Sequence, residues 1–450
     1  MNLDRRTFLG ATASGAALGF LSPLIGSPFL GRALAAGAGG TTARKMLVIF
    51  MRGGNDGINT CIPYGDPEYN QVNRPGIFIP DTQAIDLGNG FAALHPALGP
   101  LHELHLAGQL ATVHRVAYAN QSRSHFDSQH FWENAVPGDN ELYEGWAYRQ
   151  AIESYDLATQ PLAAASVSDR MMMLFRGPTA LPQISDLATY NLEVPGTSQS
   201  KLLGTSPGDG LLGWYDKTSG STHGHDALVA SAGLSVGDTL SALGTAGTDP
   251  STYVPENGAT YPSADDPQGF GDNSFPFFQK LRDAVILLKQ TDLRLAGVEL
   301  DGFDTHSNQG GPFGAQAALL AWIAHGIRSV SLDLGSAWDD TLVVTLSEFG
   351  RTSEQNGSGG TDHGEASCLF VAGGSVNGGV YNCDSTTWAP GDMFSTPNGR
   401  YVSHAIDFRA VLREVLDRHF NLTPGAINTV LPGIGGTAGD PTFADLGFLP

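Results

Sequence analysis

Five acidic or imidazole side chains of this 450-residue chain stand just after short apolar runs, or in a polar loop between two such runs: Asp56, Asp304, His306, Glu348 and His363. Carboxylates that converge repel one another, which raises their pKa values. A divalent cation removes that penalty. Carboxylates with imidazoles are ligands for zinc, manganese or iron, and carboxylates alone suit magnesium or calcium. The residue types therefore predict a shared site for one or two divalent metal ions.

Each motif also has a simpler interpretation. The segment 52–57, Arg-Gly-Gly-Asn-Asp-Gly, is typical of a turn. Asp304 could cap a helix, and Glu348 could form a surface ion pair with Arg351. The loop 361–364, Thr-Asp-His-Gly, is ambiguous alone. Four such motifs at predicted strand ends together favour one shared site.

The elements that must position these side chains alternate along the chain. Near-continuously apolar runs predict buried strands, and helical spacing of apolar residues predicts the helices between them. This alternation predicts an α/β fold, with a mostly parallel central sheet and helices on both faces. In such sheets ligands bind at the carboxyl ends of the strands, where the five residues stand. The expected strands are 45–51, 110–116, 162–167, 295–300, 341–346 and 367–372, and the expected helices are 95–107, 124–134, 275–292, 314–334 and 407–419.

A possible nucleophile opens one of these helices. Ser124 precedes His125 at the start of the helix expected over 124–134. The partial positive charge of a helix N-terminus favours an alkoxide and a bound oxyanion. Serine is equally suited to be the helix N-cap, and spacing alone favours the cap.

Two segments stand apart from the predicted fold: an N-terminal signal sequence and an internal insertion. Arg5 and Arg6 precede a long apolar stretch that ends in the small-x-small pattern 33–35, which indicates a twin-arginine signal peptide over 1–35. An ordinary secretory signal or a membrane anchor is the alternative. Residues 36–450 are expected to form a single domain, with a Gly- and Ser-rich insertion or cap over 193–273 that contains one helical piece, 228–243. Export by the twin-arginine translocase to the periplasm or beyond, with no stable membrane anchor, is expected.

Composition limits the partners. Lys and Arg number 24 against 45 Asp and Glu, a formal net charge of −21. So acidic a chain is repelled by phosphate backbones, which disfavours a nucleic acid polymer as a partner. The three cysteines allow one disulfide, and Cys368–Cys383 would close a short loop in an oxidising compartment. Glycines 53, 54 and 57 have the wrong spacing for a nicotinamide dinucleotide fingerprint.

The motifs, in their order, resemble a known family. The order is a twin-arginine start, Arg-Gly-Gly-Asn-Asp-Gly at 52–57, Ser-His-Phe at 124–126, Asp-Thr-His at 304–306, Ser-Glu-Phe-Gly-Arg-Thr at 347–352 and Asp-His-Gly at 362–364. This set resembles the exported bacterial family called domain of unknown function 1501. That family is similar to the superfamily of alkaline phosphatases, sulfatases and cofactor-independent phosphoglycerate mutases, which implies its three-layer fold.

The resemblance also implies a two-metal hydrolase or transferase with a Ser or Thr nucleophile. Asp56 and the nucleophile Ser124 match the first metal site. Asp304, His306 and His363 match the second, and Glu348 matches the acid of a later strand end. Two spacings depart from the superfamily: one residue separates Asp304 from His306, and Phe349 follows Glu348 where a His is usual.

These departures leave room for other ligands. Asp362 or His125 could complete a metal site, with His125 otherwise a substrate-binding residue, and Asn55 or Arg351 could hold the ester's oxygen atoms. Cys61-Ile-Pro63 lacks the arginine of a sulfatase motif. The expected function is hydrolysis of a small phosphate or related anionic ester. The alternative is a non-catalytic, metal-binding envelope or assembly protein.

Overall fold

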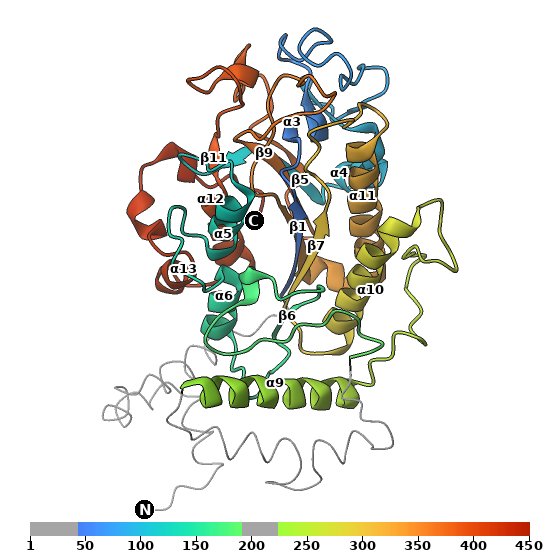
Figure 1. Ribbon diagram of the computed structural model, residues 1–450, viewed down its shortest axis with the longest axis vertical. Helices are drawn as coiled ribbons and strands as arrows, with labels where there is room; N and C mark the ends of the chain where they lie inside the picture. The colour runs from blue at the N-terminus through green and yellow to red at the C-terminus, as the bar shows by residue number, and fades with distance from the viewer. Residues whose placement is uncertain (1–43, 191–223) are drawn as a thin grey trace, which may run out of the picture.

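The computed structural model describes residues 44–190 and 224–450 (Figure 1). The predicted signal peptide, 1–35, and the first part of the predicted insertion, 193–223, lie outside the described residues. A central sheet has the strand order β10-β5-β9-β8-β1-β7-β6, and β11 also pairs with β5. Its strands are β1 (Lys45–Arg52), β5 (Leu110–Ala117), β6 (Ala164–Ser166), β7 (Leu295–Asp301), β8 (Thr341–Leu346), β9 (Ser367–Ala372), β10 (Gly379–Tyr381) and β11 (Ile406–Asp407).

All paired neighbours in this sheet are parallel except those of β9. β1 lies between β7 and β8, with Ile49 opposite both Val298 and Thr345. β9 runs antiparallel to β5 and β8. Because β9 starts at the edge where β1, β7 and β8 end, the long connection from β8 to β9 stays at that edge. This connection carries the sequence from Glu348 to His363.

The apolar runs are strands because both faces of the sheet are covered. Every residue of β1 is buried. Alternate side chains point to opposite faces of a strand, so β1 contributes to two separate cores. One set packs with helices α4, α10 and α11, and the other with α5, α6, α12 and α13 (Figure 1). The first set is Leu47, Ile49 and Met51. The second set is Met46, Val48 and Phe50.

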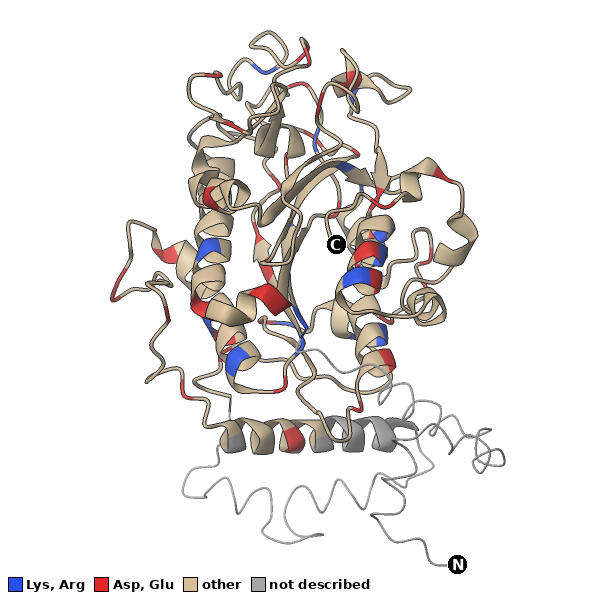
Figure 2. Ribbon diagram, turned by 180° about the vertical axis from the view of Figure 1, so that it is seen from behind, with Lys and Arg blue, Asp and Glu red and all other residues tan. Residues whose placement is uncertain are grey.

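The helices form the outer layers and carry many of the charged residues (Figure 2). The predicted α/β class, with a mostly parallel sheet and helices on both faces, is therefore confirmed. The α-helices are α3 (Gly57–Thr60), α4 (Gly99–Leu106), α5 (His125–Asn134), α6 (Trp146–Ser154), α9 (Gly224–Ala246), α10 (Phe275–Gln290), α11 (Ala315–Leu334), α12 (Phe408–Glu414) and α13 (Pro424–Val430). Short 3₁₀ segments are η2 (Pro96–Leu98), η3 (Met173–Phe175), η4 (Asp272–Ser274), η5 (Gly335–Asp340), η6 (Asp392–Phe394), η8 (Ile434–Thr437) and η9 (Pro441–Phe443).

Local chemistry shifts several predicted boundaries. The helix expected over 95–107 begins as the 3₁₀ turn η2, with a proline in its first turn, and continues as α4. The helix expected over 407–419 divides into α12 and the π-helical segment η7 (Val415–His419). The expected piece 228–243 lies within α9. The sequence did not predict a small antiparallel sheet of β2 (Cys61–Pro63), β4 (Ala92–Leu94) and β3 (Ile85–Asp86).

Two further observations concern the cysteines and the helices. Cys61, Cys368 and Cys383 are free and buried. The expected bond between Cys368 and Cys383 is therefore not formed in this structure. Over the described ranges, no helix combines the length and the apolar character needed to cross a bilayer.

Candidate metal centre

Loops from three adjacent strands meet at the carboxyl edge of the sheet. Gly53 follows β1 with a φ of +117°, and a Cβ there would stand 2.4 Å from the backbone nitrogen of Asp304. Only glycine allows this close crossing of the loops after β1 and β7. The backbone N–H of Gly53 also donates to Glu348 Oε1, which follows β8, at 2.8 Å. The loops that carry the acidic residues are thus tied directly to one another.

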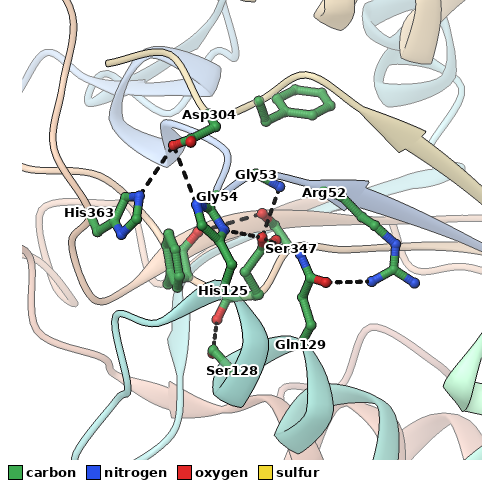
Figure 3. Close-up of polar contacts among 12 residues, drawn as sticks. Arg52, Gly53, Gly54, His125, Ser128, Gln129, Asp304, Ser347 and His363 are labelled. Carbon is green, nitrogen blue, oxygen red and sulfur yellow. Dashed lines mark hydrogen bonds and ion pairs between the residues drawn. The ribbon is translucent and has the colours of Figure 1, made fainter.

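Three imidazoles converge on one carboxylate oxygen, Asp304 Oδ1. His306 Nε2 lies 3.1 Å from this oxygen, His363 Nε2 lies 3.2 Å and His125 Nε2 lies 3.4 Å from it. His306 Nε2 and His363 Nε2 are 2.9 Å apart. Figure 3 shows His125, from the first turn of α5, and His363, from the loop before β9, on the same side of Asp304.

The opposite nitrogen of each ring is held by an oxygen atom. A carboxylate or carbonyl oxygen only accepts hydrogen bonds, so each Nδ1 carries the hydrogen and, in the neutral ring, each Nε2 presents a lone pair. Three lone pairs therefore face Asp304 Oδ1. The three pairs are His125 Nδ1 with Glu348 Oε1 at 2.8 Å, His363 Nδ1 with the carbonyl of Arg123 at 2.8 Å, and His306 Nδ1 with Asp362 Oδ1 at 3.2 Å.

This arrangement fits a divalent metal ion. Ligands at about 2.0–2.2 Å from one ion lie about 2.8–3.6 Å apart when the angle between them at the ion is about 90–109°. The triangle of Asp304 Oδ1, His306 Nε2 and His363 Nε2 has edges of 2.9–3.2 Å. His125 Nε2 is buried and has no hydrogen-bond partner among the described residues. His125, Asp304 and His363 have donor atoms within 4.8 Å of one another. Imidazole with carboxylate suits zinc, manganese or iron.

Burial and neighbouring charges shift the pKa values of the side chains in the cluster. Burial would raise the pKa of Asp304, but the hydrogen bond and charge of Arg351 outweigh it and lower that pKa to about 2. The hydrogen bond to Glu348 raises the pKa of His125 against the effect of burial. Burial lowers the pKa of His363. At neutral pH the centre therefore combines an anionic Asp304 with a more basic His125, which is a stronger ligand.

Glu348 and Asp362 stand behind the imidazoles. Glu348 is fully buried, and its Oε1 accepts hydrogen bonds from His125, Gln129 and the Gly53 backbone. Burial opposes the ionisation of Glu348, yet these bonds lower its pKa. Asp362 accepts from His306 and from Asn356 Nδ2 at 3.0 Å. Both carboxylates orient a histidine in this structure, and Glu348 makes no ion pair with Arg351.

Asp56 and Asn55 lie in a separate buried network. Asp56 is 1 % exposed and forms an ion pair with Arg74. Its Oδ2 also accepts from Gln309 Nε2 at 2.6 Å, and its Oδ1 caps α3. Asn55 is fully buried, and its Oδ1 accepts from Thr60 Oγ1 at 3.0 Å. Neither side chain reaches the imidazole cluster in this structure, so the prediction of Asp56 as a metal ligand gains no geometric support.

Ser124 and Arg351 have structural partners. Ser124 is the N-cap of α5, with its hydroxyl accepting from the Asp127 N–H at 3.4 Å. It stands between Arg123 and His125, both of which contact the cluster. The Arg351 side chain is buried and ties the strand-end loops together through Asp304 and the carbonyl oxygens of Gly53, Gly54, Phe303 and Thr361.

Sequence reasoning missed two supporting residues. Gln129 bridges Arg52 Nη1 and Glu348 Oε1, at 3.1 and 2.9 Å (Figure 3). Its position one turn after His125 on α5 was a usable signal. The backbone carbonyl of Arg123 accepts a hydrogen bond from His363. Such a contact cannot be predicted from residue type, because every residue has a backbone carbonyl.

Comparison with known families gives one match. Residues 283–431 match the family described as "Protein of unknown function (DUF1501)". The matched segment includes β7, β8 and β9 and six of the predicted site residues. A search of curated proteins found no match. The predicted site residues inside the matched segment are Asp304, His306, Glu348, Arg351, Asp362 and His363.

Proposed function

We propose that this protein is a metal-dependent hydrolase of phosphate or related anionic esters, built on an alkaline-phosphatase-like fold. One observation carries the proposal: three imidazoles, each held through its Nδ1, direct their Nε2 atoms at Asp304 Oδ1. The cluster lies at the carboxyl ends of parallel strands, where α/β enzymes bind their ligands.

A divalent cation held by Asp304, His306, His363 and His125 would stabilise the negative charge that develops on an ester oxygen. Glu348 and Asp362 fix the ring orientations. Ser124 is the candidate nucleophile, and among the described residues its Oγ accepts a hydrogen bond from the Asp127 N–H. In the proposed step, Ser124 Oγ forms a bond to phosphorus while the bond from phosphorus to the alcohol oxygen breaks, and the serine proton passes through solvent to the departing alcohol. Water then attacks the phosphoserine, which releases phosphate and returns a proton to Ser124 Oγ.

The test is metal analysis of protein purified without chelator, followed by assay on a panel of phosphate monoesters, phosphate diesters and sulfate esters. We expect bound divalent metal and turnover of at least one ester. Ser124→Ala should remove turnover and keep metal binding. Ser358→Ala, at an exposed serine of the loop between β8 and β9, is the matched control. Turnover by Ser124→Ala at the parent rate would exclude Ser124 as the nucleophile.

A second candidate function is metal binding without catalysis, in an envelope binding or assembly role. One observation favours it: the cluster offers four protein donor atoms, and a structural zinc site has its four positions filled by protein ligands. The neutralisation of Asp56 by Arg74 also removes one acid from a second metal site. Bound metal with no turnover on any ester in the panel would favour this alternative.

We also propose export by the twin-arginine translocase to the periplasm or beyond, which rests on Arg5 and Arg6 and the apolar stretch behind them. Replacing both arginines with lysine should leave the protein in the cytoplasm as an uncleaved precursor. Fractionation and N-terminal sequencing would test this. Normal export of the double variant would favour an ordinary secretory signal.

A further inference from the structure

We propose that Arg123 and Arg400 bind a second anionic group of the substrate, beside the group that the metal centre holds. This inference rests on the proposed function. It names the substrate class: esters whose alcohol part carries its own carboxylate or phosphate.

Both arginines are anchored to the outer side of the cluster. The carbonyl of Arg123 accepts the Nδ1–H of His363 at 2.8 Å. Arg400 Nη2 lies 3.8 Å from Asp362 Oδ2, and the other oxygen of Asp362 accepts from His306. Arg123 therefore contacts one histidine of the centre directly through its backbone, and Asp362 links Arg400 to another.

A single buried ring supports both guanidinium groups. Arg123 Cζ lies 5.0 Å from the centroid of the Tyr401 ring, and Arg400 Cζ lies 5.6 Å from it. Tyr401 is only 4 % exposed. Contacts of this kind between guanidinium and ring contribute about 0.5–1 kcal/mol at exposed sites. The Tyr401 ring thus keeps the guanidinium groups of Arg123 and Arg400 near each other, beside the metal centre.

Both guanidinium groups remain available to a ligand. The Arg123 and Arg400 side chains are 43 % and 57 % exposed, whereas that of Arg351 is 0 % exposed. Among the described residues, the Arg400 guanidinium donates no hydrogen bond, and Arg123 donates one, to Glu365 at 3.3 Å. Exposed ion pairs contribute little to stability, so an anion of the ligand can replace them.

The positions of the arginines separate their role from that of the metal centre. They contact Asp362 and Glu365, which lie on either side of His363, and neither contacts Asp304. If the metal centre at Asp304 holds the ester group of a substrate, the two arginines are free to bind a second anionic group of the same substrate molecule. The guanidinium fork matches carboxylate and phosphate oxygens in pairs. In a chain of net charge −21, such a pair offsets the repulsion that an anionic substrate meets.

The first experiment compares phenyl phosphate with 4-carboxyphenyl phosphate as substrates of the metal-loaded protein. For Arg123→Gln and Arg400→Gln we expect KM for the carboxylated ester to rise about tenfold, which corresponds to about 1.4 kcal/mol. KM for phenyl phosphate and both kcat values should change less than about twofold. Arg418→Gln, at an arginine 49 % exposed and paired with Asp417, is the matched control. Equal effects on the two esters would overturn the inference.

The second experiment separates this inference from the proposed hydrolysis. Calorimetric titration measures binding of 4-carboxyphenylphosphonate and phenylphosphonate, which are not hydrolysed. We expect the carboxylated probe to bind more tightly, and this advantage to disappear in both arginine variants while their melting temperatures stay unchanged. If these binding results are obtained but no ester is turned over, only the hydrolase proposal is rejected. No preference for the carboxylated probe, or no binding of either probe, would overturn the inference.

Discussion

Glu348 Oε1 accepts the Nδ1–H of His125 at 2.8 Å, and Glu348 is wholly buried. A carboxylate that orients a histidine in this way fixes its tautomer and makes its other nitrogen a stronger ligand. From the sequence, Glu348 was expected among the metal ligands, and His125 either as a substitute ligand or as a substrate-binding residue. In the structure His125 faces Asp304, and Glu348 lies behind His125.

Replacing this carboxylate should weaken metal binding. In Glu348→Gln the neutral amide no longer supports a charged or strongly polarised His125. We expect the affinity for zinc or manganese to fall about 10- to 100-fold, by analogy with other second-layer partners of metal ligands. Calorimetric titration measures the change, and Glu354→Gln, at an exposed site in the same connection, is the control. Unchanged affinity in Glu348→Gln would exclude the orienting role.

Replacing Arg351 should act on stability before it acts on any ligand. Arg351→Lys removes the planar fork that joins Asp304 to four backbone carbonyl oxygens. Lysine keeps the positive charge but cannot reach all of these buried carbonyl oxygens. Each buried acceptor left unsatisfied costs about 1–3 kcal/mol, so the free energy of unfolding, measured in urea, should fall by at least that order. Arg418→Lys should change it by less than about 1 kcal/mol. A stable Arg351→Lys protein with a raised KM would instead indicate the substrate-binding role that the sequence suggested.

The ion pair of Asp56 and Arg74 predicts a rescue. Asp56→Asn leaves the buried guanidinium of Arg74 without its counter-charge and should destabilise the fold by about 3–5 kcal/mol. Arg74→Met in the same chain should restore much of that loss, because the two charges leave together. Denaturation of both single variants and the double variant gives the coupling energy. If Asp56→Asn instead removes a bound metal from a stable protein, Asp56 is a ligand, as the family resemblance implied.

Stability should fall in mild acid because two histidines are buried in the neutral state. Burial lowers the pKa of His95 and of His419 from 6.5 to about 4. As the pH falls through 6.5 the unfolded chain takes up these protons first, so stability is lost between about pH 6.5 and 4 and is fully present above that window. Each group contributes up to about 3 kcal/mol. His419→Gln should flatten the pH dependence of urea denaturation relative to the parent protein. The same dependence of unfolding free energy on pH in His419→Gln and in the parent protein would contradict this prediction.

Much of the scaffold could be predicted, because apolar runs that are buried on both faces carry a strong signal. β8 and β9 coincide with the predicted ranges 341–346 and 367–372. The antiparallel direction of β9 could not be predicted, since hydrophobic pattern does not encode strand direction. The small sheet of β2, β3 and β4 was missed because its strands have only two or three residues.

The candidate site was predicted in part. Asp304, His306 and His363 were assigned as ligands, and the structure brings them within 3.2 Å of one another. Several partners that decide each side chain's role lie far away in sequence, such as Gln309 for Asp56 and Gly53 for Glu348. Residue types reveal which side chains can bind a cation, whereas tertiary contacts decide which of them remain free to do so.

Metal binding by Asp304, His306 and His363 is tested by a crystal structure of the protein purified without chelator. Anomalous diffraction is recorded at the absorption edge of the metal found in the protein. We predict a peak about 2.0–2.2 Å from Asp304 Oδ1 and from the Nε2 atoms of His306 and His363. A protein without metal after incubation with zinc and manganese, or a peak bound by other side chains while these three stay empty, would contradict the account.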